Sequence, residues 1–412
     1  MNGRRVYVSG VGAVSPYGLG ALPLREALFT GRSAIGPIRG FDASRFATRI
    51  GGEVPPLPLE EHFDERELGW ISKLAAHGVI AARLALEDAG WSDPDGIERA
   101  GVIFGTGFGS LAESGPHFVR WAEIGDAAAR TMTIPVLMLN APAAQMAMQL
   151  GLKGPALTVA TACSSGSDAV GQAFREIRSG AREVMLAGGG EHALTELMLL
   201  SWSRLRVLSR RNDDPEGASR PFDADRDGLV LSDAVVLLLL ESEDHLARRG
   251  GRALAEVAGY ASNCDASHLT APDEASERGA MLAALADARL APSDIDLVCA
   301  HGTSTRRNDA TEGRALRAVF ANGAPFPHVA GLKSMTGHPM GASGAIGVAA
   351  AAYALEAGVV PPTINLARLD PECPIPAPSP RAVARDLRAA MVNAFAFGGH
   401  NAVIALRRAG RS

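Results

Sequence analysis

The sequence ALTVATACSSGSDAVGQAF, which begins at Ala156, has an echo in HVAGLKSMTGHPMGASGAIGVAA, which begins at His328. Both patterns predict a short strand, a tight turn of small residues and a helix. A second pair, GVIFGTG from Gly101 and LVCAHGT from Leu297, repeats a strand that runs into a glycine turn. Such an internal repeat predicts two similar halves packed together. We place the join near residue 250, with one half over 1–250 and the other over 251–412.

The rest of the chain alternates between strand and helix signals, which predicts an α/β protein. The segment 72–90 illustrates the helical pattern, because Ser72 can cap its start, apolar residues recur at three- and four-residue spacing, and Gly90 supplies a stop. Short runs rich in β-branched residues lie between such segments and predict buried strands. These runs are 6–8, 102–104, 157–159, 184–186, 235–240, 297–299 and 403–406.

Composition and charge argue against several classes of protein. The 412 residues are 47% hydrophobic, and the net charge of -5 comes from acidic and basic residues that are interspersed, so nucleic acid is not an expected partner. The four cysteines form no CxxC pair and no zinc-type cluster, which predicts reduced thiols in a cytoplasmic protein without a metal site. The longest apolar stretch, 345–360, is shorter than the roughly 20 residues of a membrane span and contains Glu356, so no membrane anchor is expected.

Some polar and glycine-rich segments are interpreted as surface structure. The segment 209–228 is rich in Arg and Asp, which predicts a long solvated loop. The glycine run 188–190 predicts a turn after a strand, with His192 exposed. The glycines within 10–12 and 105–109 complete neither a dinucleotide fingerprint nor a Walker motif, so we expect no nucleotide cofactor.

Cys163 is the first residue that suggests chemistry, because it follows a short strand and opens a helix of small residues. Backbone N–H groups and the helix dipole favour a thiolate at such a position. A lone cysteine is usually an inert buried side chain, but two histidines occur in matching settings. His301 follows the strand that ends at Ala300, and His338 lies in a turn before a helix. Because α/β folds gather chemistry at strand ends, we predict that the three side chains share one pocket.

A family resemblance rests on six motifs, which occur in the order TACSSG, ASRPFDADRDG, HGTST-x3-D, KSMTGHPMGASG, PPTINL and NAFAFGGHN. In these motifs the chain resembles the elongating, type II β-ketoacyl-acyl-carrier-protein (ACP) synthases, and the likeness covers nearly all of its length. The resemblance implies the thiolase fold, an α/β arrangement of five layers (αβαβα) with two similar halves. It also implies a dimer, formed either with a second copy or with a related ketosynthase-like subunit.

The resemblance assigns the central reaction to three side chains. Cys163 would attack an acyl-ACP thioester and hold the acyl group, with the backbone N–H groups of Cys163 and Phe397 as the oxyanion hole. His301 and His338, as neutral imidazoles, would stabilise the enolate that forms when malonyl-ACP loses carbon dioxide. The enolate would attack the acyl-cysteine and extend the chain by two carbons. No cofactor is expected to be bound, since the substrates are carried on the phosphopantetheine of ACP.

The resemblance also implies roles for residues around that centre. Lys333 and Glu312 match a lysine and a glutamate that pair within the family's site, and Lys333 is counted with the catalytic residues. Asp309 ends the HGTST-x3-D motif and is expected to support the site. Thr303 and Thr305 match residues that hydrogen-bond the phosphopantetheine arm.

The sequence departs from the family pattern at several positions. Phe108 stands where the family lines the far part of the acyl pocket, usually with a smaller side chain, which predicts a short or unusual primer. Phe397 matches the gate residue of a mobile glycine-rich loop, but Ala396 replaces a usual Gly and His400 a usual Thr. Ser232 begins a segment that has lost three glycines of the family.

The expected docking surface for the carrier protein also differs from the family pattern. A region that is often basic in the family reads EEHFDEREL over 60–68, so Arg206 and its basic neighbours are the expected dock. A specialised carrier or a heterodimeric partner would fit polyketide or other secondary-metabolite synthesis better than housekeeping fatty-acid synthesis.

Two other functions share the fold. A CoA-dependent thiolase would carry a second catalytic cysteine near the C-terminus, where this chain has AFAFGGHN. A non-catalytic, chain-length-factor-like partner subunit would usually lack the nucleophile, whereas Cys163 is present here together with His301, His338 and Lys333.

Overall fold

The computed structural model describes residues 3–91, 97–128, 131–321 and 325–410. Most of the strands in these ranges join one mixed sheet, in the order β11-β10-β14-β15-β9-β1-β8-β7-β5-β6, and β2 (Gly18–Leu19) pairs with β1. The other bounds are β1 Val6–Ser15, β5 Gly101–Gly105, β6 Ala156–Val159, β7 Val184–Glu191, β8 Ala234–Ser242, β9 Ala255–Cys264, β10 Leu297–Cys299, β11 His328–Ala330, β14 Ala389–Ala396 and β15 His400–Arg408.

The sheet consists of two groups of strands with the same topology. In the first group β8 is antiparallel to β1 and β7, and β5 is parallel to β7 and β6. In the second group β15 is antiparallel to β9 and β14, and β10 is parallel to β14 and β11. A short antiparallel ladder between β1 and β9 joins the groups. The two similar halves are thereby confirmed, while the boundary at residue 250, between α10 (Glu243–Arg248) and β9, stays a prediction.

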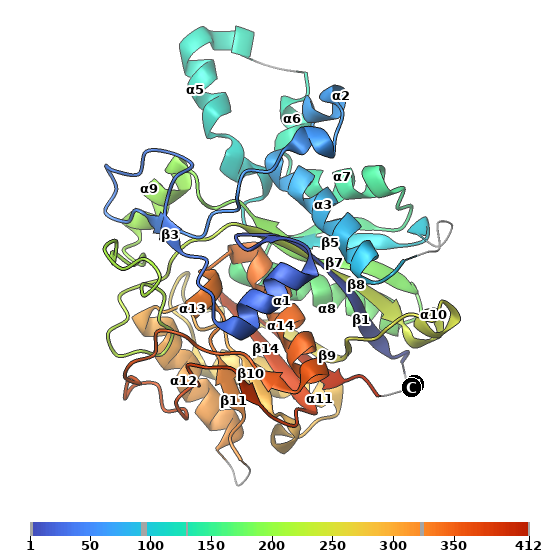
Figure 1. Cartoon of the computed structure of the whole chain (residues 1–412), viewed down its shortest axis with the longest axis vertical. Coiled ribbons are helices and arrows are strands. Elements are labelled where there is room, and N and C mark those ends of the chain that lie inside the picture. Colours follow the sequence, from blue (N-terminus) through green and yellow to red (C-terminus); the bar gives the residue numbers. More distant parts are fainter. Residues whose placement is uncertain (1–2, 92–96, 129–130, 322–324, 411–412) are drawn as a thin grey trace.

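Helices complete the five layers, and the expected αβαβα thiolase fold is confirmed (Figure 1). α3 and α7 pack on the outer side of the first group of strands, α8 and α14 pack on each other between the groups, and α11 covers the second group with α12 against it. Their bounds are α3 Lys73–Asp88, α7 Ala141–Leu150, α8 Ser165–Arg178, α11 Glu274–Ala288, α12 Arg306–Phe320 and α14 Ser343–Ala357.

The two central helices approach closely because glycines line their contact. A Cβ on Gly166 of α8 would lie 2.4 Å from the carbonyl oxygen of Gly341, and a Cβ on Gly344 of α14 would lie 2.3 Å from Ser167 Oγ. Larger residues would push the helix starts apart. The helical stretch Met340–Ala357 is long and apolar enough to span a membrane, but 83% of it is buried, as expected for a core helix.

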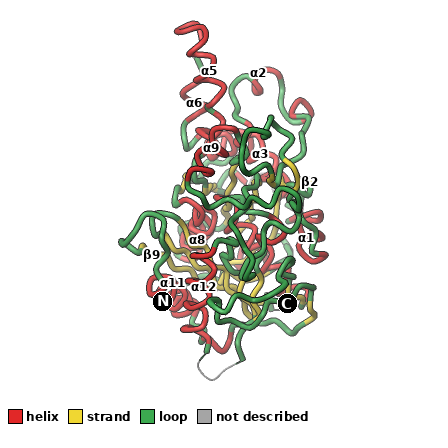
Figure 2. Tube along the Cα trace, turned by 90° about the vertical axis from the view of Figure 1, so that its left-hand side faces the viewer, coloured by secondary structure: helices red, strands yellow, loops and turns green. Residues whose placement is uncertain are grey.

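Smaller elements surround this framework. α5 projects beyond the rest of the molecule in both views (Figures 1 and 2). The bounds are α1 Ala21–Thr30, α2 Glu65–Leu68, α5 Gly115–Ile124, α6 Thr133–Leu137, α9 Glu196–Arg204 and α13 Lys333–Thr336, with the paired strands β3 Gly36–Pro37 and β4 Ile50–Gly51, and β12 Val359–Val360 and β13 Val383–Ala384.

Of the surface predictions, that of a solvated loop over 209–228 holds only in part, because Asp213 and Asp214 are exposed but residues near its end are buried, and that of a turn at 188–190 is wrong. Within 209–228, Phe222 and Asp223 have no exposed surface and Arg226 is 1% exposed. Partners distant in sequence make this burial feasible, since Arg226 Nη1 lies 2.5 Å from a carboxylate oxygen of Asp370. The glycine run 188–190 lies inside β7, and His192 after it is buried against α3.

Candidate active site

Cys163 lies in a short 3₁₀ turn, Ala162–Ser164, between β6 and α8. Ala162 has a φ of 52°, a left-handed conformation that costs an alanine roughly 1–3 kcal/mol. Side-chain hydrogen bonds hold the turn, because Ser164 Oγ donates to the carbonyl of Thr161 at 2.8 Å and Ser165 Oγ donates to that of Ala162 at 2.6 Å. The turn presents a buried sulfur at the start of α8.

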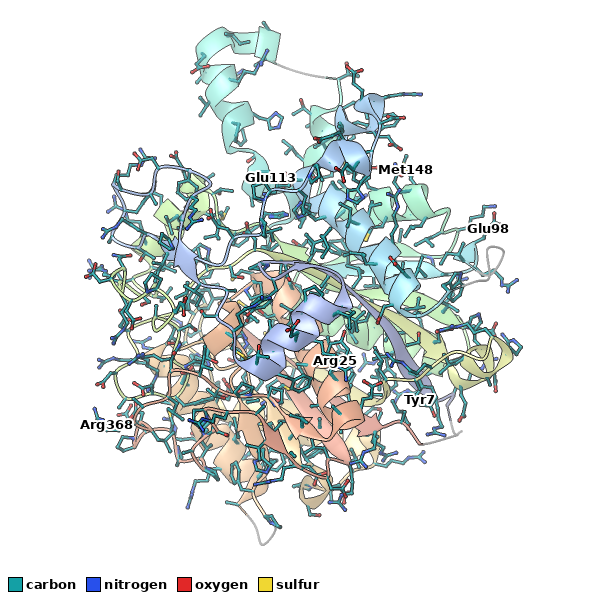
Figure 3. The ribbon with its side chains drawn as sticks, viewed as in Figure 1. Tyr7, Arg25, Glu98, Glu113, Met148 and Arg368 are labelled. Atoms are coloured by element: carbon teal, nitrogen blue, oxygen red, sulfur yellow. The ribbon has the colours of Figure 1, made fainter. Side chains whose placement is uncertain are left out.

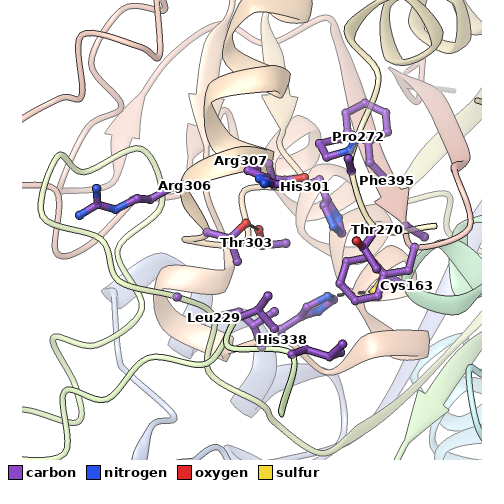
Figure 4. A pocket seen from close by; sticks show the side chains of 18 of the residues that line it. Cys163, Leu229, Thr270, Pro272, His301, Thr303, Arg306, Arg307, His338 and Phe395 are labelled. Atoms are coloured by element: carbon purple, nitrogen blue, oxygen red, sulfur yellow. Dashed lines mark hydrogen bonds between the residues drawn. The ribbon is translucent and has the colours of Figure 1, made fainter. Parts of the chain in front are cut away.

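The structure brings the two predicted histidines to this sulfur (Figure 4). His338 Nε2 lies 3.2 Å from Cys163 Sγ, and His338 Nδ1 lies 3.0 Å from Ser343 Oγ at the start of α14. The ring of His301 meets that of His338 edge to face, with centroids 5.5 Å apart. The repeated strand–turn–helix units therefore meet at one point, Cys163 from one half and the histidines from the other.

Lys333 and Glu312 hold the His301 loop from two sides. Lys333 Nζ donates to the carbonyl oxygen of His301 at 2.5 Å and lies 3.4 Å from its Nδ1. Glu312 accepts the backbone N–H groups of His301 and Gly302, each at 2.8 Å. Among the described ion pairs none joins Lys333 to Glu312 within 4.0 Å, so the expected direct pair is replaced by contacts through the His301 backbone.

Burial sets the charges in the site. It is the main cause that lowers the pKa of His301 and of His338 well below the ordinary value, and the Lys333 charge adds to it, so both rings are neutral. Burial also lowers the pKa of Lys333 to about 8, against the opposing effect of the Glu312 carboxylate. Lys333 is thus mostly charged at neutral pH and loses its proton in mildly alkaline solution.

The resting state of Cys163 differs from the sequence prediction. Burial raises the pKa of its thiol to about 12, outweighing the opposing effects of Lys333 and of the backbone N–H groups of Cys163 and Phe397. Burial thus opposes the thiolate that the position of Cys163 at a helix start was predicted to favour. Both N–H groups lie close enough to the sulfur to affect the pKa of the thiol.

Cys163, His301, His338 and Phe397 line a pocket of about 460 Å³. Thr303 and Thr305 line it with their hydroxyl oxygens 2.9 Å apart, and the exposed Arg206 stands on its rim. Phe397 also lines the pocket and stacks on Trp202, with ring centroids 5.7 Å apart, a contact that no sequence signal indicated. Other described residues of the lining include Asp227, Leu229, Asp265, Leu269, Thr270, Arg306 and Arg307.

The segment after Phe397 combines two left-handed glycines with the unusual His400. Gly398 and Gly399 have φ of 84° and 74°, which only glycine adopts readily. The His400 ring lies against Gly398, whose Cβ would be 3.1 Å from the ring. Phe108 stands outside the described lining of the pocket but packs into the apolar cluster that contains Cys163 and Phe397.

Asp309 is completely buried and joins two loops rather than facing the pocket. It accepts hydrogen bonds from the backbone N–H groups of Phe222 and Ser304. Arg226, which the sequence reading placed in a solvated loop, donates to the carbonyl oxygens of Thr305 and Arg306. The RPFDADRDG segment thus holds the HGTST loop in place. Local composition could not predict that the charges of RPFDADRDG lie close to Asp309 and Asp370.

The fold and the site define a condensing enzyme of the thiolase fold, with a buried cysteine and two neutral histidines at one pocket. The model of the β-ketoacyl synthase N-terminal domain matches residues 3–245, and that of the C-terminal domain matches 254–367. The chain belongs to the β-ketoacyl synthase family.

Relatives agree with this assignment. The chain is 38% identical to 3-oxoacyl-[acyl-carrier-protein] synthase 2 of Synechocystis sp., over 98% of both chains. It is 36% identical to the actinorhodin polyketide putative β-ketoacyl synthase 1 of Streptomyces coelicolor, over 98% of this chain and 89% of the relative. A solved structure of the ishigamide ketosynthase/chain length factor has a TM-score of 0.93 and 34% identity, over 99% of this chain and 100% of the other. The chain is a β-ketoacyl-ACP synthase and hence an acyltransferase.

Proposed function

We propose that Cys163 carries the acyl primer and that His301 and His338 act on the malonyl group. The observation that carries this proposal is the 3.2 Å contact of Cys163 Sγ with His338 Nε2, at a sulfur that two backbone N–H groups also approach. The sulfur of the proposed nucleophile therefore lies within reach of a base and of oxyanion donors.

In the first half-reaction the Sγ–H proton passes to His338 Nε2 as the sulfur attacks the thioester carbonyl of acyl-ACP. The N–H groups of Cys163 and Phe397 hold the oxyanion. When the intermediate collapses, the bond to the pantetheine sulfur breaks, and the arm leaves as a thiol with the proton from His338. Ser343 Oγ supports both forms of the ring, because a hydroxyl can donate to Nδ1 or accept from it.

In the second half-reaction Lys333 fixes the form of His301. Its ammonium group donates toward Nδ1, which leaves the ring hydrogen on Nε2. That N–H and His338 hydrogen-bond the malonyl thioester oxygen while the carbon–carboxylate bond breaks and its electron pair forms the enolate. The enolate carbon attacks the acyl-Cys163 carbonyl, the carbon–sulfur bond breaks, and the thiolate takes up a proton from solvent. The product is a β-ketoacyl chain two carbons longer.

Substrates arrive on the phosphopantetheine arm of an acyl carrier protein, and no bound cofactor is required. Thr303 and Thr305 offer hydroxyl groups to the arm along the pocket. Arg206 lies exposed at the rim with Arg306 and Arg307 nearby in the lining, which suits an acidic carrier surface.

A second subunit covers the end of the molecule that carries α5. Phe118, Val119 and Trp121 of that helix are 58–60% exposed, and the edge strand β6 leaves Leu157 48% exposed. Met148 of α7 is exposed in the same upper part of the molecule (Figure 3). Apolar surface on this scale marks a protein interface, filled by a second copy or by a related ketosynthase-like subunit.

We place the protein in the cytoplasm, with ketosynthase halves over 1–250 and 251–412.

Phe108 in the apolar cluster around Cys163 favours a short or unusual primer. Polyketide or other secondary-metabolite synthesis fits such a primer better than housekeeping fatty-acid synthesis does.

A reconstituted assay with acyl-ACP and malonyl-ACP tests the chemistry. His301→Ala is expected to retain acylation of Cys163 and to lose roughly a hundredfold or more of carbon dioxide release, since it removes a donor to the developing enolate. Cys163→Ala should lose acylation. If His301→Ala releases carbon dioxide at the wild-type rate, the assigned role of that ring is wrong.

A further inference from the structure

Glu277 is a buried carboxyl group that the reaction scheme does not use. It lies in the first turns of α11 with none of its surface exposed. Neither Oε1 nor Oε2 has a hydrogen-bond partner among the described residues. Because an isolated carboxylate is very costly to bury, such a group becomes neutral or recruits a partner.

The surroundings of Glu277 connect it to the active site. Asn393 of β14 donates from Nδ2 to Glu312 Oε1 at 3.2 Å and lies 3.6 Å from Met281 Sδ, one helical turn after Glu277. The Oδ1 atom of Asn393 also has no partner among the described residues. Glu277 and Asn393 therefore both hold buried acceptor oxygens for which the described residues supply no hydrogen.

The charges that face Glu277 disfavour its ionised form. Burial first, and then the carboxylates of Glu312, Asp265 and Asp273, raise the pKa of Glu277 well above the ordinary value. Arg314 opposes them but is engaged on the exposed side, where its Nε lies 2.9 Å from Glu274 Oε2.

We propose that Glu277 is a neutral carboxylic acid in the working enzyme and acts as a positioning residue, because its bound proton allows the neighbouring Glu312 to stay ionised behind the His301 loop. One proton on Glu277 supplies the donor that this cluster of oxygens lacks. Burial also raises the pKa of Glu312. A neutral Glu277 spares Glu312 a second neighbouring anion, so that Glu312 can hold the N–H groups of His301 and Gly302, opposite the ammonium of Lys333. A second anion beside it would draw a proton onto Glu312 and weaken that hold. What the loop does in catalysis rests on the proposed function, but the protonation state does not.

Infrared spectroscopy of the full-length protein detects the proposed proton directly. A buried protonated carboxyl group gives a carbonyl band that shifts on deuteration. In the difference spectrum at neutral pH, the wild-type protein is expected to show such a band that Glu277→Gln lacks, whereas the band of Glu191, whose pKa burial raises to about 7, is common to both proteins and cancels. Glu274→Gln, which removes an exposed carboxylate from the same helix, should keep it. Absence of the band from the wild-type protein, or its survival in Glu277→Gln, would overturn the proposal.

The pH dependence of thermal unfolding gives a second, independent sign. A carboxyl group whose pKa is raised by folding contributes stability below its unfolded pKa and loses it as pH rises toward the folded value. Glu277→Gln should therefore gain melting temperature relative to the wild-type protein as pH rises from acid to alkaline. A relative gain as pH falls would show a native carboxylate and contradict the proposal.

A bound cation is the alternative to a proton. Stabilisation of the wild-type protein by Na⁺ or K⁺ that disappears in Glu277→Gln would also overturn the proposal, whereas equal salt responses of the two proteins support it. None of these measurements requires turnover. The proposed protonation of Glu277 can therefore be disproved while the proposed function stands, and the proposed function can be disproved while the protonation stands.

Discussion

Burial of the Cys163 sulfur means that the nucleophile must be activated at the moment of attack. With the pKa of the thiol raised to about 12 by burial, the resting protein holds Sγ–H against His338 Nε2 rather than a thiolate. Attack and proton transfer therefore occur together, and the reactivity of the free thiol is a poor guide to its reactivity toward a bound thioester.

Alkylation of Cys163 by iodoacetamide tests this view. Because the thiolate fraction grows about tenfold per pH unit below the pKa, the rate should be low at pH 7 and should still be rising at pH 9. Peptide mass spectrometry would separate Cys163 from Cys264, the exposed cysteine that serves as an internal reference. A rate for Cys163 that levels off near neutral pH would mean a resting thiolate.

Lys333 makes carbon dioxide release sensitive to alkali. Burial holds the pKa of Lys333 at about 8, below its ordinary value, so the ammonium that fixes the His301 ring is present below that pH and is lost as pH rises through it. Malonyl-ACP decarboxylation, measured on enzyme already acylated, should fall over this range. Lys333→Met should be slow at all pH values and lack that transition; a Lys333→Met profile with the same transition would assign it to another group.

The residues of the site were predictable from sequence to different degrees. Motifs placed Cys163, His301 and His338 together, since each lies in a turn that follows a strand of a repeated unit. The state of the thiol was not predictable, because a local pattern carries the helix dipole but not the depth of burial. Arg226 and Glu277 were missed for a related reason, as their partners lie far away in the chain.

Single elements show the same division between local and long-range information. The start of α3 was predicted correctly, because Ser72 Oγ accepts a hydrogen bond from the N–H of Ala75 within one turn. The segment 209–228 was predicted only in part. It is a loop with Asp213 and Asp214 exposed, but Arg226 is buried because it finds a buried counterpart, Asp309, in α12.

The apolar face of α5 should control assembly. Trp121→Glu would put a charge into the proposed interface and is expected to shift the protein from dimer toward monomer, because a buried unpaired charge costs several kcal/mol. Light scattering coupled to size exclusion measures this change. Arg120→Glu on the same helix is the matched control and should stay dimeric. If the Trp121→Glu protein is as dimeric as the wild type, the interface lies elsewhere.

For the molecule as a whole, the duplicated fold explains why one pocket can serve both half-reactions, since each half of the chain contributes side chains to it. The two groups of strands bring two helix starts to a common centre, and the packing of Gly166 on Gly341 fixes their separation. The repeat was visible in sequence because each half keeps its own strand–turn–helix signal. The boundary between halves and the mode of assembly depend on surfaces that no motif marks.

Recognition of the carrier protein depends on the charged surface around the pocket entrance. Arg206→Glu should raise KM for malonyl-ACP severalfold with little change in kcat, and it should reduce the dependence of KM on ionic strength, because a rim charge acts mainly on encounter. Arg204→Glu, which changes an exposed neighbour in α9, shows how local the effect is. An unchanged KM in Arg206→Glu would remove that residue from the dock.

The most direct test of the account is the intact mass of the protein after incubation with acyl-ACPs of increasing chain length, beside a Cys163→Ala control. We expect a single acyl adduct from short chains, weaker adducts from long chains because of Phe108, and none in the control. No adduct from any carrier, or an adduct that persists in Cys163→Ala, would contradict the assignment of Cys163 as the residue that holds the primer.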